Sequence, residues 1–195
     1  FIIHHPMAAA RASVTLSVPS GRGTEAGQKP PAWALEDDFV PSVDSASIST
    51  RAGPDLVQAF LSGVCADRVG LHSSLESGFE IAVTIADPEA FKVLVTKIRS
   101  HFDELADASK LMVEKLKAQG HAEPASLMAR IDLQEAARFA AVLNLLGVRH
   151  RIAMAQFEDD FHMKDERAKL ESEVQEITQE LNETISELRA EIADM

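Results

Sequence analysis

The feature that most constrains this chain is a long C-terminal stretch without helix-breaking residues. No proline follows Pro124, and Gly147 is the only glycine after Gly120. Near the end of this stretch, seven apolar residues are spaced three or four positions apart, which places them on one side of a helix. They are Leu170, Val174, Ile177, Leu181, Ile185, Leu188 and Ile192. The pattern predicts one continuous helix over residues 124–192, roughly 100 Å long at ~1.5 Å per residue.

Charge separates this terminal helix from the rest of the chain. Residues 158–195 carry 13 acidic and four basic side chains, a net charge of −9, whereas residues 51–157 have a net charge of −1 and residues 1–50 a net charge of −2. An acidic surface repels nucleic acid and anionic lipid headgroups and attracts basic protein surfaces. Because no small body could cover so long a helix, we expect its acidic end to project and to contact other proteins rather than nucleic acid.

Glutamates flank the apolar stripe, and they indicate what kind of partner the helix would accept. Glu173, Glu180 and Glu187 recur every seven residues. In a parallel homodimer this column would meet its own copy, and each close like-charge pair costs a few tenths of a kcal/mol. A basic or apolar helix or groove of another protein would avoid that cost. We therefore predict a heteromeric contact made by the seven apolar residues and these three glutamates, with a homodimer whose acidic face is solvated as the alternative.

A helical hairpin is predicted upstream of the terminal helix. Asp87-Pro88-Glu89 has the order of a helix start, with a capping carboxylate, a proline in the first turn and an acid that suits the helix dipole. Gly120 is placed to end that helix, and Glu123-Pro124 to begin the next one. A turn of about four residues between two long amphipathic helices indicates an antiparallel pair. The predicted fold is therefore mainly all-α: an antiparallel helical hairpin or small bundle with a long C-terminal coiled-coil-like helix.

Three regions are predicted along the chain. Residues 1–50 contain five of the eight prolines and form a disordered or extended segment. Residues 51–157, in which order begins at Gly53-Pro54-Asp55, form the helical body, and residues 158–195 form the acidic extension. Residues 7–23 combine arginine and hydroxyl side chains with no acid, which is the composition of a transit segment for a mitochondrion or plastid. An unstructured tail of a cytoplasmic protein is the alternative interpretation.

One segment of the predicted body has an ambiguous pattern. Apolar residues at every second position between Phe79 and Ile85 alternate with smaller or polar ones, which is typical of a strand. No partner strand is evident elsewhere in the chain, and a single short strand is not stable alone. Residues 79–85 are therefore predicted to be either a short extended segment or part of a helix.

Groups that could carry out chemistry are few. Cys65 is the only cysteine, so neither an intrachain disulfide nor a cysteine-based zinc site can form. On one helix, Cys65 and His72 would lie about 10 Å apart along the axis, too far for a nucleophile and its base. We therefore expect Cys65 to be a buried thiol without a catalytic role.

Two pairs of residues have the spacing of half a metal site. His101 and Glu104, like Asp159 and His162, are three positions apart, as in carboxylate-bridged metal bundles. In the predicted hairpin the two pairs would be separated by about 30 Å along the helix axis, so they could not share a metal ion. We expect no catalytic residue, no cofactor and no metal site.

These observations favour a non-catalytic structural or assembly subunit, or an adaptor, that binds other subunits through the acidic C-terminal helix. The alternative is a helical-bundle enzyme, or a carrier of a small ligand or metal, with a pocket within residues 54–157. Such a pocket requires polar side chains that converge on inward helix faces, and the pattern indicates almost none. A membrane span is not expected, because no apolar run reaches the ~18 residues that one requires.

Overall fold

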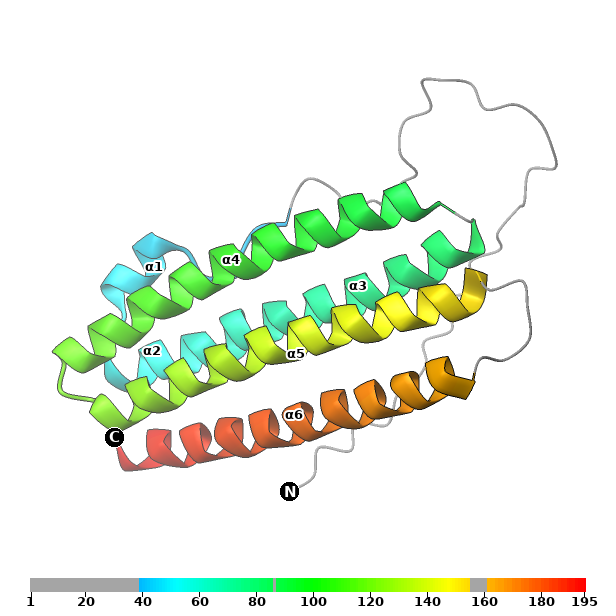
Figure 1. Cartoon of the computed structure of the whole chain (residues 1–195). Helices are drawn as coiled ribbons and strands as arrows, with labels where there is room; N and C mark the ends of the chain where they lie inside the picture. Colours follow the sequence, from blue (N-terminus) through cyan, green and yellow to red (C-terminus); the bar gives the residue numbers. More distant parts are fainter. Residues whose placement is uncertain (1–38, 86, 155–160) are drawn as a thin grey trace, which may run out of the picture.

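The structure of this chain is a computed structural model, and it describes residues 39–85, 87–154 and 161–195. Across these ranges the regular secondary structure is helical, which confirms the all-α prediction (Figure 1). The elements are α1 (Ser45–Thr50), α2 (Gly53–Ala59), the π-helical turn η1 (Phe60–Val64), α3 (Cys65–Thr84), α4 (Pro88–Ala118), α5 (Ala122–Met154) and α6 (Phe161–Asp194). None of these helices combines the length and apolar character that crossing a membrane requires.

The predicted hairpin is present as α4 and α5, and local signals explain both ends of α4. The Asp87 side chain caps α4 by accepting a hydrogen bond from the Ala90 N–H at 3.0 Å. At the other end Gly120 has a φ of +88°, a conformation that side chains other than glycine rarely adopt. The His121 N–H then donates to the Leu116 carbonyl at 3.0 Å, which closes the turn of a Schellman motif.

The strand alternative for residues 79–85 is wrong, because α3 continues through Thr84. Leu75, Phe79 and Ala82 are buried on one side of α3, with the spacing of three to four residues that a helix requires. The same segment also contains the alternation of apolar residues that suggested a strand. Gly78 lies on the same side and allows α4 to approach closely. A Cβ atom added at Gly78 would lie 2.0 Å from Leu94 Cδ2.

Helical structure also begins earlier than the predicted start at Gly53-Pro54-Asp55. Helix α1 precedes that point. Val43, just before α1, and Ile48, within it, are both buried in the core. Lys115 of α4 donates to the carbonyls of Ile48 and Ser49 at 2.8 and 2.6 Å, which ties the end of α1 to the body. The predicted boundary at residue 50 is therefore too late. The transit-like residues 7–23 lie outside the residues that the structure describes.

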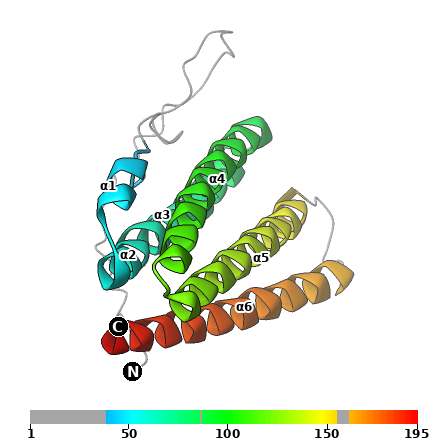
Figure 2. The same cartoon turned by 90° about the vertical axis from the view of Figure 1, so that its left-hand side faces the viewer.

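The prediction of one continuous helix over residues 124–192 is wrong. Helix α5 ends at Met154, and α6 begins at Phe161 and runs back along α5 in the opposite direction (Figures 1 and 2). Two ion pairs fix this direction, since Arg130 near the start of α5 pairs with Glu187, and Arg151 near its end pairs with Glu166.

The physical reason for the reversal lies on the flank of α5 that carries Arg130. Ala141 and Val148 follow on that same flank, and both are buried. An α6 that projected away would leave these residues and its own apolar stripe in water. Burial of apolar surface contributes about 25 cal/mol per Å², so the chain is stabilised when the two helices cover each other.

The core lies between α3, α4 and α5, with α2 and η1 at one end and α6 along the outer flank of α5 (Figure 2). Its fully buried side chains come from every one of these elements. Among the largest are Leu56, Phe60, Leu71, Leu75, Ile98, Leu105, Met112, Leu116, Met128, Ile131 and Leu146.

Candidate functional site

The apolar stripe predicted to bind a partner packs against the chain itself. Leu181 and Leu188 are 3% and 0% exposed and belong to the core. Val174, Ile185 and Ile192 are half-buried against it. Leu170 and Ile177 are also half-buried. In this conformation the apolar stripe packs against α5 and the adjoining core. A partner contact through these seven residues stays a prediction.

The three predicted glutamates lie on the surface, but they differ in their partners. The Glu187 carboxylate pairs with the Arg130 guanidinium, whose Nε also donates to the Thr184 hydroxyl at 3.2 Å. Glu173 and Glu180 are exposed and form no ion pair within the part of the chain that the structure describes. Two of the three glutamates are therefore free to meet an external charge.

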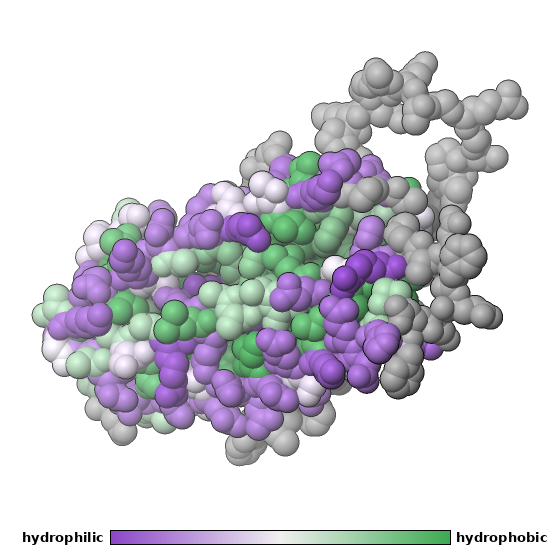
Figure 3. Space-filling model, in the orientation of Figure 1, coloured by the Kyte–Doolittle hydropathy of each residue, from purple (hydrophilic) through white to green (hydrophobic). Residues whose placement is uncertain are grey.

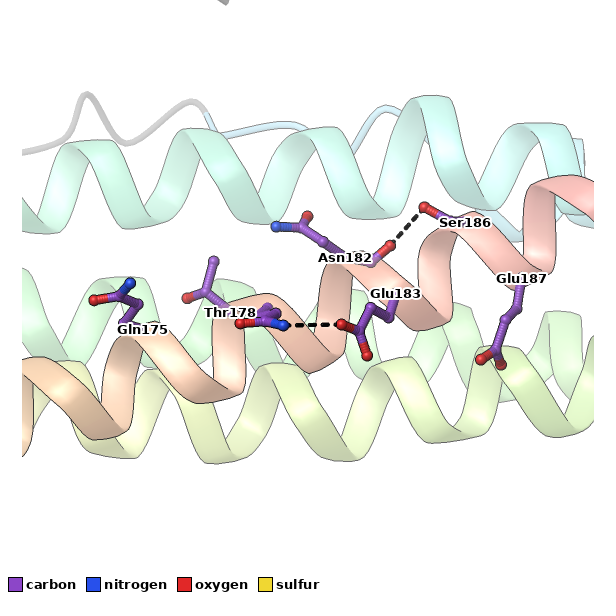
Figure 4. Close-up of a pocket in the computed structure, with 7 residues that line it drawn as sticks. Gln175, Thr178, Asn182, Glu183, Ser186 and Glu187 are labelled. Atoms are coloured by element: carbon purple, nitrogen blue, oxygen red, sulfur yellow. Dashed lines mark hydrogen bonds between the residues drawn. The ribbon is translucent and has the colours of Figure 1, made fainter. Parts of the chain in front are cut away.

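A shallow groove of about 610 Å³ runs along α6, and in Figure 4 Gln175, Thr178, Asn182 and Ser186 point to one side of the helix and Glu187 to the other. It is lined by Gln175, Thr178, Gln179, Asn182, Glu183, Ser186 and Glu187. Most of these side chains are neutral and polar, and Gln179 donates to the Glu183 carboxylate at 3.0 Å. Helix α6 thus has three surfaces. Its apolar side packs on the bundle, and Glu173, Glu180 and Glu187, the partner of Arg130, form an acidic side. The groove carries hydrogen-bonding side chains.

A second polar site lies inside the bundle and was not found from the sequence. Arg68 of α3 is 2% exposed, and its Nη1 lies 2.8 Å from the Asp132 Oδ1 of α5. Ser109 of α4 donates to the other oxygen of Asp132 at 2.5 Å. Burial raises the pKa of the Asp132 carboxyl above its ordinary value, and it outweighs the opposing effects of Arg68 and Ser109.

A histidine and a glutamate extend this cluster one turn further along the bundle. His72 Nε2 and Glu135 Oε2 are 3.3 Å apart, and both side chains are almost completely buried. The His72 ring forms T-shaped contacts with the rings of Phe102 and Phe139, with centroids 5.2 and 6.2 Å away. Arg138 approaches the second oxygen of Glu135 at 3.7 Å. Helices α3, α4 and α5 thus all contribute polar groups to one buried cluster.

The prediction that inward helix faces carry almost no polar side chains is therefore wrong. A signal was available, since Arg68, His72, Leu75 and Phe79 follow one another at steps of three or four residues. Arg68 and His72 consequently share the buried side of α3 with two apolar residues. Their partners are on α5, some 63 residues away in sequence for His72 and Glu135, and no local pattern connects them.

The other candidates for chemistry have structural roles or lie outside the described residues. Cys65 is buried as predicted, and burial raises the pKa of its thiol to about 12, which suppresses the reactive thiolate. His101 and Glu104 are 3.6 Å apart on α4, and the His101 ring lies 4.4 Å from that of Phe39. Asp159 falls outside the described residues.

No group of three metal-ligating side chains gathers in a suitable arrangement across residues 39–85, 87–154 and 161–195. Comparison with known protein families, with curated proteins and with solved structures finds no match to this chain.

Proposed function

We propose that this protein is a non-catalytic structural subunit or adaptor that docks a basic segment of another protein onto the outward side of α6. The observation that carries the proposal is the uncompensated acidity of this helix. Residues 161–194 hold ten acidic and four basic side chains. Two of those basic residues, Arg167 and Lys169, already pair with acids of α6 itself.

The attachment of α6 supports a partner on its outward side. Among the helices that the structure describes, α6 packs mainly along α5 and, near its C-terminal end, against α2, and many of its residues, Glu173 and Glu180 among them, are exposed. Figure 3 shows hydrophilic residues along the lower edge of the molecule, where α6 lies in Figure 1. A basic partner would approach Glu173 and Glu180 without breaking an ion pair, and the groove would supply hydrogen-bonding groups.

The proposal changes which side of α6 makes the contact. The apolar stripe could reach a partner only after α6 left α5, which would expose Leu181 and Leu188 to water. Burying each such side chain contributes about 1.5–3 kcal/mol, so detachment would weaken any complex that required it. The outward side requires no such rearrangement.

The test reverses charge at the two unpaired glutamates and leaves the fold intact. We expect Glu173→Lys combined with Glu180→Lys to release the partner set that co-purifies with the tagged full chain, as quantified by mass spectrometry. The matched control is Glu76→Lys combined with Asp107→Lys, two exposed acids on α3 and α4. The wild-type interaction should also weaken as salt rises above about 0.1 M, because exposed charges are then screened. Retention of all partners by the α6 variant, or equal loss in both variants, would refute the proposal.

The compartment is proposed from sequence alone. Residues 7–23 have the composition of a mitochondrial or plastid transit segment, which would place the assembly in one of these organelles. A fluorescent protein fused behind residues 1–50 should then enter the organelle, and a cytoplasmic signal would contradict the assignment.

A further inference from the structure

A crevice of about 200 Å³ opens between α4 and α5 beside the buried polar cluster. Its lining comes from α3, α4 and α5 and includes Arg68, Phe102, Ala106, Asp132, Ala136 and Phe139. Arg99 and Asp103 stand at its exposed edge. The proposed contact on α6 does not involve any of these residues, so the crevice calls for its own explanation.

The floor of the crevice presents a hydrogen-bond donor and an acceptor that are not fully used. Arg68 is 2% exposed, and its buried Nε–H has no hydrogen-bond partner among the described residues. Asp132 Oδ1 lies within ion-pair distance of Arg68 Nη1, yet neither atom makes a hydrogen bond of good geometry there. Buried polar groups in folded proteins are almost always hydrogen-bonded. A guest that accepts from Arg68 and donates to Asp132 would satisfy both.

The walls of the crevice favour a flat guest. Ala106 and Ala136 are small, exposed residues on the facing sides of α4 and α5. Phe102 and Phe139 lie deeper and pack on each other with ring centroids 4.6 Å apart. Figure 3 shows an apolar band along the middle of this face of the molecule. A ring could enter between the two helices with its apolar body against the alanines and its polar edge on the floor.

The charges around the crevice favour a neutral guest. Arg68 and Asp132 form one pair, and Glu135 is approached by His72 at 3.3 Å and by Arg138 at 3.7 Å. An anion would be repelled by the Asp132 and Glu135 carboxylates. A cation would be repelled by the Arg68 guanidinium, and either would be costly in a site of low polarity.

We propose that this crevice binds a small, neutral, planar molecule with a hydrogen-bond acceptor next to a donor, such as a primary carboxamide or the edge of a heterocycle. The acceptor faces Arg68 and the donor faces Asp132. This inference is independent of the proposed adaptor function, since the two sites share no residue.

Three probes of nearly equal size and shape test the chemistry. Benzamide carries an acceptor and a donor, benzoate only acceptors, and benzamidine only donors. Titration of the full chain, followed by amide NMR shifts, should show millimolar binding of benzamide near Arg68 and Asp132. Benzoate and benzamidine should bind at least about tenfold more weakly, a difference of 1.4 kcal/mol or more. Equal binding of all three probes, or binding of none, would overturn the proposal; the second result would mean that the crevice holds only water.

Two neighbouring substitutions on α5 provide a matched pair. Ala136→Leu fills the mouth of the crevice, whereas Ala137→Leu adds the same side chain at an exposed position outside it. Both exchanges are compatible with a helix, because alanine and leucine have high helix propensity. We expect benzamide binding to be lost in Ala136→Leu and kept in Ala137→Leu, with circular dichroism confirming that both variants are folded. Binding that survives Ala136→Leu would exclude this crevice as the site.

Discussion

Helix α5 has two antiparallel neighbours, and they are joined to it in different ways. On one flank α4 packs against α5 over a core that α3 also enters, so residues such as Leu105 are enclosed from several sides. On the other flank α6 packs along α5 with α2 as a further neighbour near its C-terminal end, and of its described residues Leu181, Thr184 and Leu188 are buried. The comparison shows that two helices of similar length can be held to the same neighbour with very different degrees of enclosure.

The polar contacts of the two flanks differ in the same sense. In the cluster between α3, α4 and α5 the charged groups are largely buried, as in the pair of Arg68 and Asp132, whose side chains are 2% and 22% exposed. Between α5 and α6 they are exposed, with side-chain exposures of 48% for Arg130 and 56% for Glu187. Exposed ion pairs contribute about 0–1 kcal/mol, so apolar packing is what mainly holds α6 in place. The inner helices should therefore unfold together, and α6 should open first.

The largest expected effect comes from making equivalent cavities on the two sides of α5. Leu105→Ala removes a 0% exposed side chain from the inner core and should destabilise the fold by about 2–5 kcal/mol, as measured by urea unfolding. Leu181→Ala, at 3% exposure in α6, should cost less because that site has fewer enclosing neighbours and can relax. Hydrogen exchange should show faster opening of α6 alone in Leu181→Ala and of α3, α4 and α5 together in Leu105→Ala. Equal costs with global opening in both variants would contradict the comparison.

A smaller effect, dependent on pH, is expected for Asp132→Asn in the buried cluster. Because burial raises the pKa of this carboxyl above its ordinary value of 3.8, the folded chain binds a proton there more tightly than the unfolded chain does. Wild-type stability contributed by this group is therefore greatest when Asp132 is protonated and falls as pH rises through the raised pKa.

Asp132→Asn removes this pH dependence, so the stability of the variant relative to wild type should improve as pH rises from about 4 to about 8. Thermal unfolding at several pH values measures the difference. A relative stability that worsens with rising pH would show that the pair with Arg68, rather than burial, dominates at this site.

The smallest effect is expected at the outer flank. Arg130→Gln removes the ion pair with Glu187 and the bond from Arg130 Nε to Thr184, both at a half-exposed position. The free energy of unfolding should fall by at most about 1 kcal/mol, and less at high salt. A loss of several kcal/mol in urea unfolding would mean that polar contacts, not apolar packing, hold α6 on α5.

Local signals in the sequence predicted the helices better than they predicted how the helices pack. Asp87 and Gly120 mark the ends of α4 because capping and a positive φ depend on residues within one turn. The strand alternative at Phe79 failed because a period-2 pattern and a helical pattern overlapped on the same residues. Burial on one side of α3 decided between them.

Of the two candidate sites, one could be predicted from local sequence and the other could not. The exposed acids of α6 were recognisable from charge and spacing, since exposure of a charged side chain is its usual state. The buried cluster was missed because Arg68 is an unusual core residue whose partner, Asp132, lies on another helix. Helical spacing predicts that Arg68 lies on the inward side of α3. It does not predict which carboxylate on another helix will pair with the buried guanidinium, and without such a pair the burial would be too costly.

By itself the sequence determined that the chain is helical, where α4 begins and ends, and that its C-terminal helix is acidic with one apolar side. Only the tertiary structure decided that this apolar side turns back onto α5 and that Arg68 meets Asp132 and His72 meets Glu135. The physical reason is that helical periodicity states which residues share a side of one helix. It does not state which surface will cover that side, because that choice depends on the apolar area and charge that distant segments offer.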